Sequence, residues 1–170
     1  DMVLFREMTF SNIKINQNII DGQIDASYSI ASANIGDSIE LNNVLFHSEG
    51  INNHLLSNLT WDPNSKYQSD ISWITDIVSD ELVSITIQPS SFSIDKKKWI
   101  IADSSHILIT SADLKINDFE LSRNNQLIQI NGAITNDLSD ALNLRLTNID
   151  LSFEAYNYIN YMFLIIILNI

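Results

Sequence analysis

The chain has 170 residues, of which 45% are hydrophobic, and its formal net charge is −12. The hydrophobic share is that of an ordinary globular protein and excludes general disorder. The acidic balance argues against nucleic acid as a partner, because phosphates attract basic proteins. The chain has no cysteine, which excludes disulfides and thiolate metal sites. With four glycines and two prolines, most turns must be built from Asn, Asp and Ser.

We expect the chain to begin inside a longer protein, because it starts at Asp1 and no leader-like segment follows. Apolar residues then recur at every second position, which is the period of a β-strand. In chain order, the alternation covers residues 24–30, 51–61, 83–87, 107–109, 114–121, 128–134 and 142–146. The expected turns include the polar pairs Asn52-Asn53, Asp95-Lys96 and Asn124-Asn125.

Residues 72–82 fit two structures. Trp73, Ile74 and Ile77 recur near a helical spacing, but Ile71, Trp73 and Ile77 also alternate as in a strand. The rest of the chain has no sustained helical period. We therefore predict an all-β fold with at most one short helix.

The end of the chain differs from the rest. Alternation stops after Leu151, and residues 154–170 are rich in Tyr, Asn, Ile and Phe. Their apolar run is shorter than the roughly 20 residues that span a bilayer. Two interpretations stay open: a buried strand cut off by the chain end, or residues translated from a shifted frame. We divide the chain into a β-rich segment, 1–153, and an atypical tail, 154–170.

No pattern in the sequence indicates catalysis. His47 and His54, with Glu49 between them, could meet in a hairpin as a weak metal site, but their spacing matches no known zinc pattern. The Gly-rich phosphate loop and the Gly-x-Ser-x-Gly elbow are both missing. We expect no enzyme activity, no cofactor and no metal. The carboxylates are too dispersed along the sequence to indicate an acid pair: Asp21, Asp25, Glu40, Asp70, Asp113, Asp118 and Glu120.

The aromatic and basic residues have an ordinary interpretation and a functional alternative. Trp61, Trp73 and Trp99 are interpreted as core or cross-strand packing, with ligand lining as the alternative. The cluster Lys96-Lys97-Lys98 is interpreted as a charged turn, with a small anion contact as the alternative. The triplet Asn58-Leu59-Thr60 matches a glycosylation acceptor, a motif that arises often by chance.

The segment Pro89 to Trp99 reads Pro-Ser-Ser-Phe-x-Ile-x-x-x-x-Trp and resembles the TamB family, in its Bacteroidota branch, of translocation and assembly module proteins. Three later stretches continue the resemblance: Phe119–Ser122, Ile128–Ile134 with its Ile-x-Ile-x-Gly-x-Ile pattern, and Leu144–Leu151. The resemblance covers about residues 69–151, and the N-terminal third fits only in general character. None of these stretches contains a catalytic signature.

The resemblance implies an elongated, curved antiparallel β-sheet, a β-taco, with an apolar inner face. Members are very long periplasmic proteins of Gram-negative bacteria, anchored in the inner membrane by an N-terminal helix. They work with an Omp85-class outer-membrane barrel protein in envelope biogenesis. Their groove is expected to guide phospholipid acyl chains or outer-membrane protein clients between the two membranes. This chain would be an internal segment of that groove, without the anchor helix and the C-terminal domain.

The residues support a groove without the resemblance. A long antiparallel sheet with one apolar face must cover that face or use it. A lengthwise curl would make a dry trough that acyl chains could fill as side chains do. Two alternatives stay open: a structural or adhesive β-repeat segment of a cell-surface protein, and a carbohydrate-binding or enzymatic β-domain. The candidate groove residues are Ile24, Tyr28, Ile30, Ile85, Ile87, Ile128, Ile130, Ile134, Leu142, Leu144 and Leu146.

Overall fold

The computed structural model of the chain describes residues 2–5, 8–35, 39–94, 96–137 and 139–149. Within these residues fourteen strands form one antiparallel sheet and no helix occurs, so the all-β prediction is confirmed. Accordingly, no helix of the described ranges is long and apolar enough to cross a membrane. The tail, 154–170, lies outside the described residues, and both interpretations of it stay untested.

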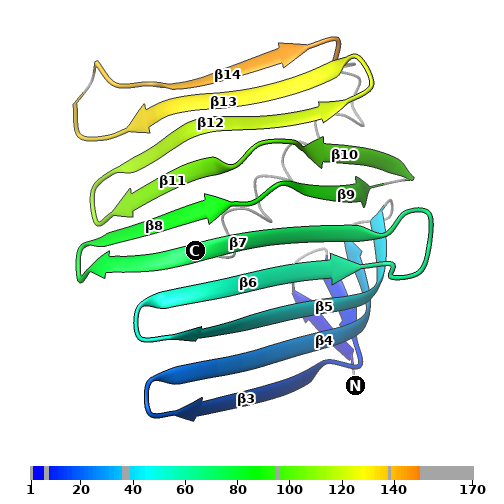
Figure 1. Ribbon diagram of the computed structural model, residues 1–170. Helices are drawn as coiled ribbons and strands as arrows, with labels where there is room; N and C mark the ends of the chain where they lie inside the picture. Colours follow the sequence, from blue (N-terminus) through cyan, green and yellow to red (C-terminus); the bar gives the residue numbers. More distant parts are fainter. Residues whose placement is uncertain (1, 6–7, 36–38, 95, 138, 150–170) are drawn as a thin grey trace.

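The four strands between residues 23 and 79 form a meander of long strands in the N-terminal half of the sheet (Figure 1). β2 and β3 lie end to end beside β4, since β2 pairs with residues 32–35 and β3 with residues 23–29. The ambiguous segment 72–82 is strand up to residue 79. The strands are β1 (Met2–Phe5), β2 (Met8–Ser11), β3 (Lys14–Ile20), β4 (Gln23–Ile35), β5 (Ile39–Ile51), β6 (His54–Trp61) and β7 (Ser69–Ser79).

The C-terminal half continues the meander with two broken rows. The strands are β8 (Leu82–Ile87), β9 (Ser90–Ile94), β10 (Lys97–Ile101), β11 (Ser105–Thr110), β12 (Leu114–Arg123), β13 (Gln126–Ile134) and β14 (Leu142–Thr147). β8 and β9 share one row and both pair with β7, while β10 and β11 share the next row and both pair with β12. Pro89 lies in the gap between β8 and β9. This position fits a residue that has no N–H for a strand ladder.

Asn, Asp and Lys residues make the turns that glycine often makes. Asp21 and Gly22 have φ of 49° and 77°, as a type I′ hairpin requires. Asn52 and Asn124 both have φ of 54°, and each begins one of the expected turns. Lys96, with φ of 60°, lies between β9 and β10, in the third expected turn. Asn tolerates this left-handed region better than most residues, which is how a chain with four glycines closes its hairpins.

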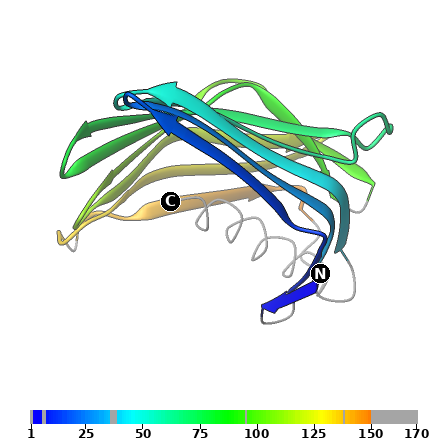
Figure 2. The ribbon, with the colours of Figure 1, turned by 90° about the horizontal axis from the view of Figure 1, so that it is seen from below.

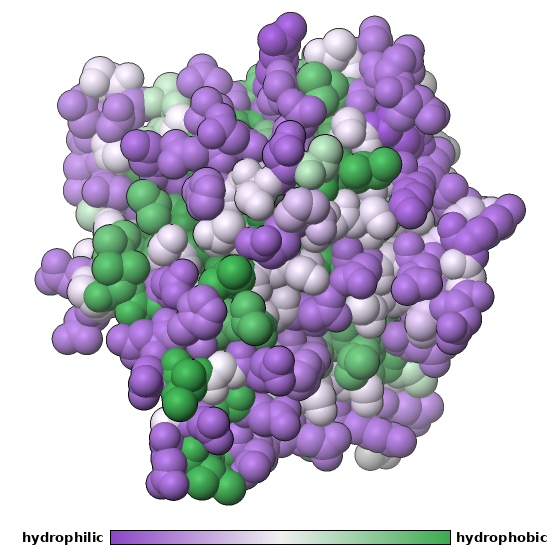
Figure 3. All heavy atoms as spheres, in the orientation of Figure 1, coloured by the Kyte–Doolittle hydropathy of each residue, from purple (hydrophilic) through white to green (hydrophobic). Residues whose placement is uncertain are grey.

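The sheet is curved, and from below it has the outline of an arch (Figure 2). The first hairpin, β1–β2, bends toward the hollow side of this arch. Asn12, with φ of 51°, lies where the row is interrupted between β2 and β3. On the face that is turned to the viewer in Figure 3, hydrophilic side chains predominate.

Buried apolar side chains form one cluster that extends from β2 to β13. Trp61, only 1% exposed, packs against Phe92 with ring centroids 6.0 Å apart. Its indole N–H donates to the carbonyl oxygen of Ser93 at 3.0 Å. The backbone N–H of Ser93 in turn donates to the hydroxyl of the fully buried Ser69 at 2.8 Å. These bonds attach β9 to β6 and β7 where the row is broken.

Candidate ligand-binding face

Strand register places the candidate groove residues on one side of the sheet. Directly opposed residues of antiparallel strands project to the same side, and so do residues two apart along a strand. We call this side the apolar face. One row of opposed residues crosses the sheet from β4 to β14: Ile24, Gly50, Leu55, Thr75, Ile85, Ile107, Ile116, Gly132 and Leu142.

The remaining candidates follow from this row. Tyr28 and Ile30 continue the parity of Ile24 along β4, and Ile87 continues that of Ile85. On the last two strands Ile130 pairs with Leu144 and Ile128 pairs with Leu146. Ile134 lies two residues from Gly132. All eleven candidates therefore lie on the apolar face, although they come from four strands: β4, β8, β13 and β14.

The apolar face is buried in its middle and exposed at its margins. Among the candidates, Ile85, Ile87, Ile128 and Ile130 are buried, Ile130 with 2% exposure. On the last strand, β14, Leu144 is 46% exposed. A ligand approaching the described sheet would therefore reach the margins of this face first.

The opposite margin of the apolar face is formed by β3, which the sequence analysis did not assign to a strand. Ile15 and Ile19 are 61% and 60% exposed, and they pair with Tyr28 and Ile24. Alternation of apolar and polar residues at 13–16 was the available signal, but Gln17 and Ile20 break the pattern. This margin adds two aliphatic side chains to the candidate face.

Three aromatic rings form a run across the apolar face. The ring centroids of Tyr28 and Phe46 are 5.6 Å apart, and those of Phe46 and Trp73 are 5.8 Å apart in a stacked arrangement. All three residues are half-buried. Phe46 was missed because it lies in β5, where the alternation is interrupted. Trp99 is half-buried too, with the Arg123 guanidinium 5.2 Å from the centre of its ring.

The other face carries polar side chains bonded in pairs. His47 Nε2 lies 3.1 Å from Asp25 Oδ1, and His54 Nδ1 lies 2.6 Å from Asp76 Oδ1. The two histidines thus turn to strands on opposite sides, β4 and β7, and do not form the hairpin pair considered from the sequence. Among the described residues no group of three His, Cys, Asp or Glu could hold a metal ion.

The polar pairs also lack the order that activates a nucleophile. Asp76 bonds to His54 on one side and is opposed by Ser84 on the other. In a Ser-His-Asp triad the histidine must stand between the acid and the serine, because it takes the proton of the hydroxyl. Here the acid stands in the middle, so this group cannot act as such a triad.

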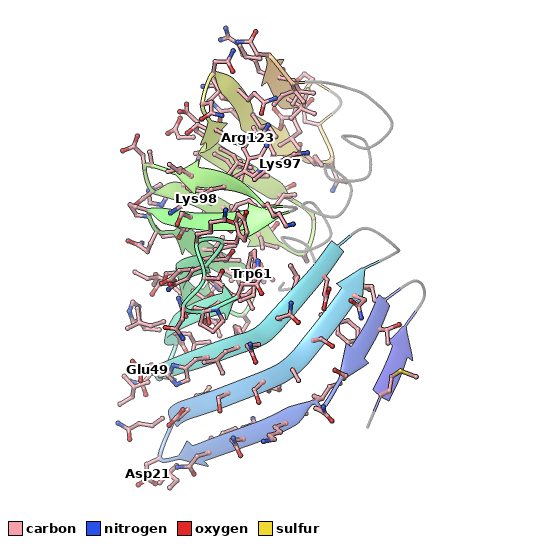
Figure 4. The ribbon with its side chains drawn as sticks, turned by 90° about the vertical axis from the view of Figure 1, so that its right-hand side faces the viewer. Asp21, Glu49, Trp61, Lys97, Lys98 and Arg123 are labelled. Carbon is pink, nitrogen blue, oxygen red and sulfur yellow. The ribbon has the colours of Figure 1, made fainter. Side chains whose placement is uncertain are left out.

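Charge differs between the two ends of the strands. Figure 1 shows the turns after β3 and β7, which carry Asp21 and the pair Asp80 and Glu81, at one end of the strands. The β9–β10 turn beside Lys97 and the end of β12 at Arg123 lie at the other end, and Figure 4 shows Lys97 and Arg123 on these neighbouring strands. The clear pKa shifts belong to exposed loop residues. A hydrogen bond with Tyr67 raises the pKa of Lys66, and hydrogen bonds from Ser139 lower the pKa of Asp137. Neither group belongs to the apolar face.

The chain matches no family model, no curated protein and no solved structure. The stretches that resemble TamB proteins occupy distinct places in the sheet. Pro89 marks the row break, Phe92 and Trp99 are opposed on β9 and β10, and Gly132 lies in the row that crosses the apolar face. The function is therefore inferred from the geometry of the apolar face and from these residues.

Replacing His47 or His54 with alanine is expected to change the free energy of unfolding by less than about 1 kcal/mol, because exposed polar pairs stabilise little. Urea denaturation of each variant, with and without added zinc, measures this. We expect the same midpoint with and without the metal. Stoichiometric zinc in the purified protein, or a midpoint that rises with zinc and falls back in the variants, would contradict this expectation.

Proposed function

We propose that the chain is a groove segment of a TamB-like envelope biogenesis protein, and that its apolar face guides phospholipid or outer-membrane protein clients between the inner and outer membranes. The observation that supports the proposal is the continuous row of paired residues from Ile24 to Leu142, which places all the candidate groove residues on one face of one curved sheet. We place this face on the hollow side of the arch.

The arrangement of the strands supports a groove more than a closed sandwich. All fourteen described strands belong to one sheet, whereas a sandwich packs two sheets face to face. The face visible in Figure 3 is mostly hydrophilic, as expected for the outer side of an arch. A ligand that lies in the hollow could reach the exposed side chains of Ile15 and Leu144 at the two margins.

The chemistry of the exposed margins suits acyl chains. Ile15, Ile19, Ile134 and Leu144 offer branched aliphatic surface and no hydrogen-bonding group. Each methylene group buried against such surface stabilises a complex by about 0.8 kcal/mol, and acyl chains have no polar group to satisfy. A sugar would need convergent polar groups beside an aromatic platform, but the hydroxyls of Ser48 and Ser57 beside this platform are buried and bonded to each other at 3.0 Å. We therefore favour lipid over carbohydrate.

The proposal places the protein in the periplasm as part of a longer, inner-membrane-anchored chain. Its partner would be an Omp85-class outer-membrane barrel protein, as the resemblance implies. The basic residues at one end of the strands, Lys97 and Arg123, would then lie close to lipid phosphates, while the acyl chains follow the apolar face. The alternative of a structural β-repeat segment predicts no lipid on either face.

Photo-crosslinking with matched positions tests the proposal. A benzoylphenylalanine at Leu144 lies on the apolar face, and one at Leu56 lies on the opposite face, opposed to Glu49 and Ile74. Both leucines are 46% exposed in the native chain, so access alone does not separate them. With vesicles of phosphatidylethanolamine and phosphatidylglycerol, we expect lipid adducts from position 144 only. Equal adducts at both positions would contradict lipid binding by the apolar face in particular, and no adduct at either position would favour a structural segment.

A further inference from the structure

The outer edge of β3 is open in the described sheet. Among the described strands β3 pairs only with β4, and each of its seven residues is exposed. An unpaired edge offers a row of free N–H and C=O groups to another strand. Proteins often protect such edges with proline, with charge or with a very short strand, and β3 carries one charge, Lys14, at its start.

The sequence of this edge reads the same in both directions. Residues 15–19 are Ile-Asn-Gln-Asn-Ile, with Gln17 at the centre. In an antiparallel pair of two such strands, Ile15 would oppose Ile19, Asn16 would oppose Asn18, and Gln17 would oppose itself. A two-fold contact requires this kind of self-complementarity, since the same patch meets itself.

The hydrogen-bonding pattern of the β3–β4 hairpin fits this register. The two-residue turn Asp21-Gly22 closes on the opposed pair Ile20 and Gln23, and the pair next to such a turn bonds across the hairpin. Bonding alternates along an antiparallel pair, so Ile15, Gln17 and Ile19 direct their backbone groups toward the free edge. In the palindromic register these three residues oppose one another, which satisfies all of them.

We propose that two copies of the chain pair through β3, antiparallel, about a two-fold axis at Gln17. The axis is perpendicular to the sheet, so the two apolar faces lie on the same side and form one continuous surface. Lys14 of each copy then lies opposite Ile20 and beside Asp21 of the other, which places opposite charges together at both ends of the contact. Side chains of Ile15 and Ile19, 61% and 60% exposed in one copy, pair across the contact.

The contact is short, so we expect the two copies to bind weakly. Seven residues a side bury less surface than the standard interface of a stable complex, so the dimer belongs to the weak class. We expect a dissociation constant of about 10 µM to 1 mM, and therefore a monomer–dimer equilibrium within the range that sedimentation velocity can follow. The inference is independent of lipid binding, which the crosslinks at positions 144 and 56 test separately.

Paired charge substitutions test the register. Ile15→Lys with Ile19→Lys places like charges opposite each other twice, and we expect at least about a tenfold loss of self-association. Ile15→Lys with Ile19→Glu adds the same number of charged side chains but pairs Lys with Glu twice, and we expect association to return toward the native value. Equal association of both variants and the native chain, in sedimentation velocity at several concentrations, would overturn the proposal.

A single cysteine tests the axis, because the native chain has none. Opposed residues of a bonded pair have Cα atoms about 5.5 Å apart, within disulfide range. We expect oxidised Gln17→Cys to form dimers, and Ile15→Cys alone to form few, because its copies lie about 13 Å apart along the strands. Ile15→Cys mixed with Ile19→Cys should crosslink again. A monomer under all these conditions would overturn the two-fold contact. So would a crosslink found only between Gln17→Cys and Asn143→Cys chains, because it would mean that β3 pairs head-to-tail with β14 of another copy.

Discussion

Replacing Ile130 with arginine is expected to lower the free energy of unfolding by about 3–5 kcal/mol, or to prevent folding. Ile130 is 2% exposed and lies between Phe119 and Leu144 on the neighbouring strands. A guanidinium placed there loses water and finds no opposite charge among its direct neighbours. Urea denaturation followed by tryptophan fluorescence measures the change.

Leu144→Arg is the matched control for this substitution. Leu144 is the direct cross-strand partner of Ile130 on the same face, but it is 46% exposed. Its charge can stay in water, so we expect a change in stability below about 1 kcal/mol. Equal destabilisation by both substitutions would contradict the difference in exposure between position 130 and position 144.

Gly132→Ala is expected to destabilise the sheet by about 3 kcal/mol, an unusual effect for the addition of one methyl group. The φ of Gly132 is 122°, in a region that side chains rarely adopt. A Cβ at this position would also lie 2.2 Å from the carbonyl oxygen of Ala141. Because that oxygen belongs to the backbone, the clash cannot be relieved by a change of rotamer. Thermal unfolding of the variant measures the loss.

Gly22→Asn separates this effect from the general loss of a glycine. Gly22 also has positive φ, 77°, but its Cβ would meet only Asn52 Oδ1, at 3.5 Å. Asn tolerates the left-handed region, so we expect a loss below about 1 kcal/mol. Equal stability of the two variants would show that the nearby Ala141 carbonyl oxygen does not restrict position 132 to glycine.

The strand content could be predicted from period-two alternation, but the parity could not always be followed. Asn43 and Asp118 have φ of 50° and 56°, and each shifts the pattern by one residue. In β5 the buried apolar positions change from odd to even numbers between Leu41 and Val44. In β12 they change from even to odd numbers between Ile116 and Phe119. Asn and Asp adopt such φ values in turns as well, so the sequence does not distinguish a bulge from a turn.

The run 51–61, interpreted from its parity as one apolar side, is divided by the expected turn at Asn52-Asn53. Ile51 ends β5, opposed to Gln23 and His54 on the other face, and is 49% exposed. Leu55, after the turn, lies on the apolar face. Across a two-residue hairpin turn, two residues that both have odd numbers lie on opposite faces of the sheet. Parity alone therefore could not reveal that the face changes at this turn.

The membership of the candidate face could be predicted, whereas its exposure could not. All eleven residues lie on one face because alternation within each strand is a local property. Burial depends on which strands are neighbours and on what lies over them. Ile130 and Leu144 are both aliphatic and face the same side, yet Ile130 is 2% exposed and Leu144 is 46% exposed. That difference arises from tertiary structure, which local patterns do not contain.

The central claim is that acyl chains contact the apolar face, and methyl NMR with spin-labelled phospholipid tests it most directly. With Ile and Leu methyl groups labelled, a doxyl group on the acyl chain broadens signals near it. We expect broadening at Leu144, Ile134 and Ile19, and sharp signals from Leu56 and Leu45, which are 46% and 42% exposed but lie on the opposite face. Equal broadening on both faces, or none at the apolar margins, would contradict it.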